Sequence, residues 1–358
     1  MKRNVHITLA DIAERLDVSR VTVSKALRGH PDISEGMAKK IRRMASDLGY
    51  SPNRMARNLS ARKSHLLGLV VPKIAHFFFG SVIESVYTKA LENRYETILM
   101  VSHENDEQEI QHLQTLVSMR VDGIIISVSA KTHDTKVFEW IKKIGIPLLF
   151  LDRIPDPAPK GAASVMVDDY GGTVKAIEQA ISVGHQSIGF LGGDSNINIG
   201  RNRLQGYTDA LRRHGIPVRE EWIVNGGYGT ESGYEGYMRL YAQGAMPTCF
   251  FAITYPVALG IYDAAKATRA RIPDDVDVIC FGDGDVGRLL APALSCVSQP
   301  TQRLGEEAVN AMMRMIDQPE GIPAGEIVVP TELILRETCV RRIVPGQPIA
   351  ALVPHQGA

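Results

Sequence analysis

The chain has 358 residues, of which 44 % are hydrophobic and 22 % charged, a composition typical of a globular protein with two or three domains. Its aromatic content of 6 % argues against a stacking platform for single-stranded nucleic acid. The formal net charge is zero, but residues 1–65 contain 14 basic and 6 acidic residues, so only this N-terminal part is expected to meet a polyanion.

Three short helices are predicted in the first fifty residues. The first begins at Thr8, which has the spacing of a capping box with Asp11. The second begins after Ser19 and the third after Ser34, because both are favourable capping residues that precede apolar periodicity. A short turn between the first two helices is typical of a helix-turn-helix, so residues 1–50 are predicted to form a DNA-binding domain.

The second helix is predicted to enter the major groove of DNA. Arg20 and Lys25 can donate to guanine and Val21 can contact a thymine methyl group, so these three are the predicted base-reading residues. The predicted phosphate-contacting residues are Thr8, Ser19, Thr22, Ser24, Tyr50 and Asn53. A helical module for protein interaction with a solvated basic face is the alternative.

Residues 51–65 are predicted to form a hinge helix and a linker. The helical part is too short to be stable alone, so it could fold on DNA and insert Leu59 between base steps of the minor groove. The predicted hinge residues are Arg54, Ala56, Arg57 and Leu59. An ordinary interdomain linker explains the same segment equally well.

From residue 66 onward, short apolar runs alternate with helical patterns. The predicted strands are 67–71, 97–101, 123–128, 147–151, 187–191, 249–253 and 276–281. The predicted helices include 79–93, 106–119, 171–183, 203–214, 232–242 and 257–268. Buried strands that alternate with helices are typical of doubly wound parallel sheets.

This series is too long for one sheet of typical size, and a stretch rich in proline and glycine at 154–161 falls near its middle. We therefore expect two α/β subdomains with a cleft between them, a common place for a small ligand. Residues 341–358 lose periodicity and are predicted to be a loose tail.

The four cysteines are Cys249, Cys280, Cys296 and Cys339. They form no CxxC pair and have no histidine at zinc-finger spacing, so buried free thiols are predicted and no metal site or cofactor. The N-terminal residues do not resemble a signal peptide, and no apolar run is long enough to span a bilayer. The sequence therefore predicts a cytoplasmic protein with no membrane partner.

Several segments together resemble the lactose repressor/galactose repressor (LacI/GalR) family. The most specific matches are TLADIA at 8–13, VSRVTVSKAL at 18–27, LGYSPN at 48–53 and ARNL at 56–59. Weaker matches follow in the same order as in the family, at 121–125, 146–147, 152–153, 203–207, 258–260 and 297–300. The resemblance covers nearly the whole chain.

The resemblance implies a ligand-responsive repressor of carbohydrate-utilisation genes, associated with the nucleoid. It would bind a near-palindromic operator as a homodimer, with a tetramer possible, and pair its hinge helices over the minor groove. A periplasmic-binding-protein-like effector domain would span 66–340, with one subdomain at about 66–164 and 297–323 and the other at about 165–293 and 326–340. A sugar or sugar derivative in its cleft would change the order of the hinge.

By resemblance, Asp152, Asp169 and Arg203 lie where the family binds its effector. Their charges suit the hydroxyl groups of a sugar, although structural ion pairs are the alternative. The other predicted effector-binding residues are Phe78, Thr254, Tyr255 and Asp283. The aromatic run at 76–79 could line the mouth of the cleft or only begin a helix.

Three positions depart from the family pattern. Lys25 stands where many members carry arginine, and it lacks the bidentate fork, so base discrimination is expected to be softer. Thr254-Tyr255-Pro256 replaces a common Asn-Asp, and Gly282 replaces an aspartate that is usually aimed at the ligand. The loss of two polar groups counts against a typical monosaccharide effector.

An enzyme is not predicted. Residues 282–287 match GxGxxG after a strand, but Pro292 would end the following helix after about one turn, and Asp283 and Asp285 would repel phosphate. A nicotinamide-dependent enzyme is therefore a weak alternative. A solute-binding protein is another, and it would need a signal peptide and no basic head.

Overall fold

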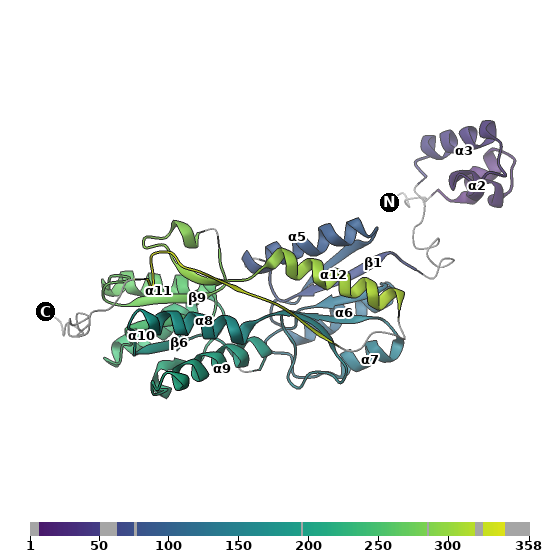
Figure 1. Cartoon of the computed structure of the whole chain (residues 1–358). Helices are drawn as coiled ribbons and strands as arrows, with labels where there is room; N and C mark the ends of the chain where they lie inside the picture. Colours follow the sequence, from purple (N-terminus) through teal and green to yellow (C-terminus); the bar gives the residue numbers. More distant parts are fainter. Residues whose placement is uncertain are drawn as a thin grey trace, which may run out of the picture. The chain divides into compact units, whose positions relative to one another are not determined.

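The structure is a computed structural model that describes residues 7–50, 63–74, 77–194, 196–284, 286–318 and 325–340. The chain divides into two compact units, Met1–Ser64 and His65–Ala358. Figure 1 shows that the smaller unit is built of helices and the larger unit of strands flanked by helices. The predicted hinge helix and the predicted loose tail lie outside the described residues.

The smaller unit, called the head below, contains α1 (Leu9–Arg15), α2 (Arg20–Leu27) and α3 (Glu35–Asp47). Each predicted capping residue immediately precedes its helix. Thr8 and Asp11 form the capping box, with the Asp11 carboxylate 2.7 Å from the backbone nitrogen of Thr8. Ile12, Val23 and Ile41, one from each helix, are fully buried in a common core. The predicted helix-turn-helix bundle is confirmed.

The first sheet of the larger unit is parallel throughout, in the order β2-β1-β3-β4-β5-β11. Its strands are β1 (Leu66–Val71), β2 (Glu96–Val101), β3 (Gly123–Ile126), β4 (Leu148–Leu151), β5 (Ala163–Val167) and β11 (Glu326–Val329). Its helices are α5 (Phe77–Glu92), α6 (Asp106–Ser118), α7 (Lys136–Ile144) and α12 (Thr301–Asp317). Every residue of β3 is buried, as expected for a strand covered on both faces.

The second sheet has the order β7-β6-β8-β9-β10-β12, and only the edge strand β12 is antiparallel to its neighbour among the described strands. Its strands are β6 (Ile188–Leu191), β7 (Ile223–Val224), β8 (Cys249–Ala252), β9 (Asp277–Phe281), β10 (Ser295–Ser298) and β12 (Glu332–Ile334). Its helices are α8 (Asp169–Ser182), α9 (Asn198–Arg213), α10 (Thr230–Ala242) and α11 (Tyr255–Thr268), with 3-10 turns at Glu220–Trp222 and Gly287–Leu289. No helix in the described ranges is long and apolar enough to cross a membrane.

Every strand and helix predicted within the described residues is present, and the predicted pair of doubly wound sheets is confirmed. The sequence did not predict α7, α12, β5, β7, β10, β11 or β12. Most of these strands are short, and β11 and β12 lie at sheet edges, where exposed residues blur the apolar pattern.

The described chain passes between the sheets after β5, after β10 and after β11. These points differ from the predicted subdomain limits. β5 continues to Val167 in the first sheet, and β11 pairs with it along four residues, although 326–329 was predicted to belong to the other subdomain. β10 belongs to the second sheet although residue 297 was placed in the first subdomain. Strand pairing, which the sequence does not reveal, decides these memberships.

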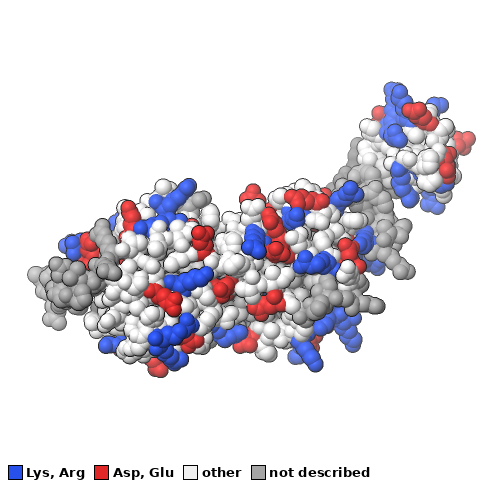
Figure 2. Space-filling model, in the orientation of Figure 1, with Lys and Arg blue, Asp and Glu red and all other residues white. Residues whose placement is uncertain are grey.

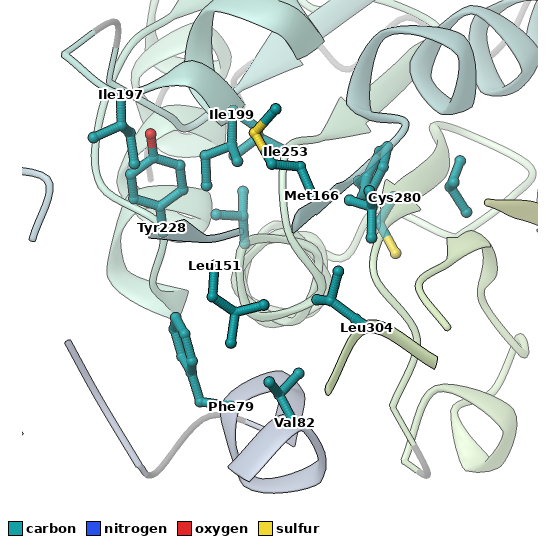
Figure 3. Close-up of a cluster of buried hydrophobic side chains, with 14 of the residues drawn as sticks. Phe79, Val82, Leu151, Met166, Ile197, Ile199, Tyr228, Ile253, Cys280 and Leu304 are labelled. Carbon is teal, nitrogen blue, oxygen red and sulfur yellow. The ribbon is translucent and has the colours of Figure 1, made fainter. Parts of the chain in front are cut away.

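One apolar core continues through both sheets of the larger unit. Figure 3 shows a part of it to which both halves contribute, with Phe79 and Leu151 from the first half and Ile199, Tyr228 and Ile253 from the second. The two halves are therefore held together by burial as well as by the chain connections.

The packing of α10 against α11 depends on two glycines. A Cβ added at Gly260 would lie 2.0 Å from the backbone oxygen of Thr230, and one at Gly233 would lie 2.0 Å from that of Val257. Gly260→Ala should therefore force the helices apart and lower the free energy of unfolding by about 1–3 kcal/mol, measured by urea denaturation.

Gly80→Ala in α5 is the matched control for this variant. Nothing lies within 4 Å of a Cβ added there, so alanine should leave stability unchanged or raise it by up to about 1 kcal/mol. Equal losses of stability in the two variants would contradict close packing at Gly260.

Candidate functional site

The exposed face of α2 carries the side chains predicted to read DNA bases. Arg20 is exposed and Val21 is 64 % exposed, whereas Val23 and Ala26 of the same helix are buried in the head. An exposed valine in the first turn of a helix is available for an apolar contact in the major groove. Figure 2 shows basic side chains, with some acidic ones, on the surface of the head and both signs of charge interspersed over the larger unit.

The serine and threonine hydroxyl groups predicted to contact phosphates are held in place by hydrogen bonds within the head. Ser19 Oγ accepts a hydrogen bond of 3.0 Å from the Thr22 backbone N–H and lies 2.8 Å from Thr22 Oγ1. Thr8 Oγ1 lies 2.7 Å from the Asp11 carboxylate. Arg28 donates to Ser24 Oγ. Thr8, Ser19 and Thr22 are therefore fixed near the positive N-terminal ends of α1 and α2, where anions bind favourably, whereas Ser24 lies in the C-terminal half of α2.

Lys25 has an intramolecular partner. Its Nζ lies 2.9 Å from Asp32 Oδ2, and Asp32 also lies 3.3 Å from His30 Nδ1. The hydrogen bond from Lys25 lowers the pKa of Asp32 below its usual value, and the nearby His30 adds to this effect. Exposed ion pairs of this kind are weak, so Lys25 can leave Asp32 and contact a base at little cost in free energy.

The remaining predicted DNA contacts lie at or beyond the end of the head. The Tyr50 N–H donates to the Ala45 carbonyl at 2.8 Å, which closes the end of α3. Asn53 and the predicted hinge residues Arg54, Ala56, Arg57 and Leu59 lie outside the described residues.

A cleft that is open to solvent lies at the carboxyl ends of strands from both sheets. Of the predicted effector-binding residues, it is lined by Phe78, Asp152, Arg203, Thr254, Tyr255 and Asp283. The three phenylalanines at 77–79 begin α5 and also line the cleft. The described part of the aromatic run therefore does both of the things considered for it. Ligands of open α/β sheets bind at such strand ends.

Asp169 does not line the cleft but lies behind Arg203. Arg203 is 2 % exposed, and its Nε and Nη2 lie 2.8 and 2.7 Å from Asp169 Oδ1. Its Nη1 donates to the Ile253 carbonyl at the end of β8, and the guanidinium carbon lies 3.7 Å from the ring centroid of Phe281. Asp169 therefore orients the guanidinium, and its Oδ2 has no hydrogen-bond partner among the described residues.

Arg153 is a second buried guanidinium, and the sequence did not predict it as a site residue. Its Nη1 lies 2.8 Å from Glu104 Oε1. Its guanidinium carbon lies 5.5 Å from the ring of Phe79 in the first half and 5.2 Å from that of Tyr228 in the second. Its Nε has no hydrogen-bond partner in the described chain. Arg153 thus bridges the halves and keeps a donor available.

Glu104 is the counter-charge of Arg153. Burial raises the pKa of Glu104, but the charge of Arg153 and the hydrogen bond from the Ala130 N–H outweigh burial and leave this pKa below its usual value. The Glu104 carboxylate is therefore ionised at neutral pH and stabilises the guanidinium in the cleft.

Asp152 follows β4 and is strained. Its φ of 63° lies in the left-handed region, which non-glycine residues seldom adopt, and it is only 3 % exposed. Burial raises the pKa of Asp152 to about 7, and the charge of Asp169 adds to this effect, while Arg153 and Arg203 oppose it. Its Oδ1 has no hydrogen-bond partner in the described part of the chain.

Asn198, the first residue of α9, connects the loop after β4 to the second half. Its Oδ1 accepts from the Ile154 N–H at 2.8 Å, and its Nδ2 donates to the Asp152 carbonyl at 2.9 Å. Pro155 and Ile197 form an isolated β-bridge beside it. These contacts fix Asp152 and its neighbours across the cleft.

The opposite wall of the cleft is also fixed by hydrogen bonds. Asp283 lies 2.7 Å from Nη2 of Arg336. Thr254 Oγ1 caps α11 and donates to the Tyr228 carbonyl at 2.9 Å. Gly282 has a φ of 93°, which favours glycine at this position. Further lining residues that the sequence did not predict are Ile199, Tyr228, Pro256, Phe281 and Gln299.

Comparison with known proteins places both parts of the chain. Residues 8–53 match the family described as "Bacterial regulatory proteins, lacI family", and residues 177–339 match a periplasmic binding protein-like domain. "Probable HTH-type transcriptional repressor ExuR" of Bacillus subtilis (strain 168) is 33 % identical over 341 residues, which are 94 % of this chain and 99 % of that protein. The chain belongs to the lacI family. As a member of the lacI family it is a DNA-binding transcription regulator and not an enzyme.

Other lacI-family proteins match along nearly the whole length. The ribose operon repressor of Haemophilus influenzae (strain ATCC 51907 / DSM 11121 / KW20 / Rd) is 30 % identical and covers 92 % of this chain and 98 % of its own. The Lac repressor dimer bound to operator and the anti-inducer ONPF shares the fold, with a TM-score of 0.80, 24 % identity and coverage of 93 % of this chain and 99 % of that one.

The raised pKa of Asp152 predicts a pH dependence of stability. The folded protein binds more protons than the unfolded chain between the pKa of an unfolded aspartate, about 4, and the folded value of about 7. The stabilisation from protonated Asp152 is therefore full below about pH 4 and is lost as the pH rises through about 7. Asp152→Asn should remove this loss, on the order of 2–4 kcal/mol, measured by urea denaturation across that range.

Asp263→Asn is the control, because Asp263 is exposed on α11 and should leave the pH profile of the wild type unchanged. Parallel profiles for wild type and Asp152→Asn would show that Asp152 does not titrate as its burial requires.

Proposed function

We propose that this chain is a ligand-responsive repressor of carbohydrate-utilisation genes, in which a polyhydroxylated effector in the cleft changes the affinity for a near-palindromic operator. The observation that carries this proposal is the pair of buried guanidinium groups, Arg153 and Arg203, at the meeting point of the two sheets. A ligand that binds both halves can shift the equilibrium between two arrangements of them.

The unsatisfied polar atoms of the cleft favour a sugar or sugar derivative. Oδ1 of Asp152 and Nε of Arg153, both lining residues, have no hydrogen-bond partner among the described residues. Sugar hydroxyls can donate to the carboxylate of Asp152 and accept from Arg153 at once, and the faces of Phe78 and Tyr255 suit the apolar face of a sugar ring. Solved structures of similar fold include a CelR–cellobiose complex and an Enterococcus faecium regulator with bound ribose.

The residue roles follow the same proposal. Arg20, Val21 and Lys25 read base edges, and the hydroxyls at the helix starts contact phosphates. The segment at 52–59, with Leu59 inserted into the minor groove, couples the effector domain to DNA. The subdomain limits given above, corrected for strand membership, describe the two moving halves.

A homodimer is the assembly we propose, with a tetramer as a further possibility. Tyr87 and Leu91 on α5 are 48 % and 50 % exposed, and Leu99 on β2 is 38 % exposed. α5 and β2 pack against each other, so these apolar side chains share one side of the larger unit. A second copy that covers this side would bring two heads to one palindromic operator. The repressor works in the cytoplasm, where bacterial operators lie, in association with the nucleoid.

The DNA-binding part is tested by selecting duplexes from a random pool and measuring affinity by fluorescence anisotropy at several salt concentrations. The wild type should prefer a near-palindrome, and Lys25→Ala should lose about 5- to 150-fold in affinity for it, the effect of one lost base contact. Lys39→Ala, an exposed lysine of α3, should have a much smaller effect. Binding that depends on salt alone, with no sequence preference, would contradict the proposal.

The effector part is tested by thermal-shift screening against neutral sugars, sugar acids and nucleobases, since a ligand of the cleft raises the melting temperature. Arg203→Lys keeps the charge but loses the bidentate fork, so it should lower the affinity for the effector about tenfold or more. Arg201→Lys on the same helix is the control, because Arg201 is 40 % exposed and pairs with Asp156. If both variants respond alike, the ligand does not bind where we propose.

A further inference from the structure

A cluster of four buried side chains lies outside the cleft and has no role in the proposed function. His185 precedes β6, Cys249 begins β8, Asp277 begins β9 and Cys339 follows β12. Cys249 and Cys339 are 0 % exposed, His185 is 2 % exposed and Asp277 is 3 % exposed. The cluster therefore lies at the amino ends of the parallel strands of the second sheet, whereas the cleft lies at their carboxyl ends.

We propose that His185, Cys249 and Cys339 bind a divalent, thiophilic metal ion of the zinc class, which clamps the segment around Cys339 to the second sheet. Two sulfur atoms and one imidazole nitrogen form a ligand set that such ions prefer. The three ligand atoms all lie within 4.8 Å of one another. The proposal is independent of the effector cleft.

The spacing of the sulfur atoms fits tetrahedral coordination. Sγ of Cys249 lies 3.5 Å from Sγ of Cys339. Two sulfurs that each lie about 2.3 Å from a tetrahedral zinc ion are about 3.7 Å apart, so the pair needs to move only slightly. As the metal–sulfur bonds form, the two thiol protons leave to solvent, and a water molecule can take the fourth position.

Asp277 is placed to support such a site. Its Oδ2 lies 3.2 Å from Nε2 of His185, and both carboxylate oxygens accept the Cys339 N–H at 3.0 Å. A carboxylate that accepts from a histidine ring commonly orients that histidine for its metal. Asp277 thus connects two of the proposed ligands through a single carboxylate.

The other ring nitrogen of His185 can be released at little cost. Nδ1 lies 2.9 Å from Thr248 Oγ1, which also donates to the Ser187 carbonyl at 3.0 Å. If Nδ1 turns to a metal, the Thr248 hydroxyl keeps an acceptor, so no buried donor is left unsatisfied.

The clamp would stabilise the last described segment of the chain. Gln179 Nε2 of α8 donates to the Cys339 carbonyl at 2.8 Å, and the Glu337 N–H donates to the Ala293 carbonyl at 2.9 Å. These hydrogen bonds already place Cys339 against the sheet. The unfolded chain does not hold these ligands together, so the metal would bind the folded protein preferentially and should raise its melting temperature.

Cobalt(II) is the probe for the test, added to the full-length, reduced and chelator-treated protein. The wild type should bind one equivalent with a thiolate-to-cobalt charge-transfer band and tetrahedral visible bands, and zinc should displace it. Cys339→Ser should reduce the charge-transfer band and weaken binding about tenfold or more. Cys280→Ser is the matched control, because Cys280 is also buried in the second sheet but lies outside the cluster, and it should bind like the wild type.

Absence of the charge-transfer band in the wild type, or an equal band in Cys339→Ser, would overturn the proposal. So would a Cys249–Cys339 disulfide, detected as a loss of two hydrogens in the intact mass, that persists in reductant and leaves cobalt unbound.

A second measurement needs no variant and applies even if Cys339→Ser fails to fold. In urea below the unfolding transition, zinc should slow alkylation of Cys249 and Cys339 in the wild type but not that of Cys280 and Cys296, as read by peptide mass mapping. Equal rates with and without zinc at all four cysteines would overturn the metal site while leaving the effector proposal untouched.

Discussion

The buried ion pair between Arg203 and Asp169 is the interaction on which the cleft depends. Asp169 begins α8 and Arg203 lies in the second turn of the next helix, α9. The guanidinium also reaches the Ile253 carbonyl and the ring of Phe281. Arg203 therefore holds together the ends of β8 and β9 and the helices beside them. Removal of either partner would leave an uncompensated buried charge, which costs several kcal/mol, about 3–5 in known cases.

Around this pair, the polar groups of the cleft come from both halves. Asn198 ties the loop after β4 to α9, and Arg153 lies between the rings of Phe79 and Tyr228. The halves are thus connected by a few directional contacts above a continuous apolar core. A ligand that replaces or strengthens those contacts can select one arrangement of the halves, because packed interfaces change between discrete states.

The sequence predicted what local rules determine. The caps at Thr8 and Ser19 and the apolar faces of the head depend on residues three or four positions apart, so the helix-turn-helix could be recognised directly. The alternation of strands and helices likewise indicated doubly wound sheets. Short strands such as β11 and β12 have too few residues to show an alternation of apolar and polar side chains. Their sheet membership depends on partner strands that are far away in the sequence.

Within the site, the sequence located side chains but not their arrangement. Asp169 is among the predicted effector-binding residues, and the structure places it behind Arg203, outside the set of residues that line the cleft. Arg153 was missed although it follows Asp152 directly. Its role depends on contact with two rings, those of Phe79 in the first half and Tyr228 in the second, and the sequence does not show that these come together. The cluster of His185, Cys249 and Cys339 was missed for the same reason, since residues so far apart share no motif spacing.

The central claim is that the cleft and the operator are energetically coupled, and reciprocity tests it most directly. Once an effector and a selected operator are known, calorimetry gives the effector's Kd for the free protein and for the operator complex, and anisotropy gives the operator's Kd with and without effector. The account predicts that both affinities change by the same factor, typically 5- to 150-fold, because a coupling free energy is shared by the two sites. An effector that binds the cleft with the same Kd whether or not operator is bound would contradict it.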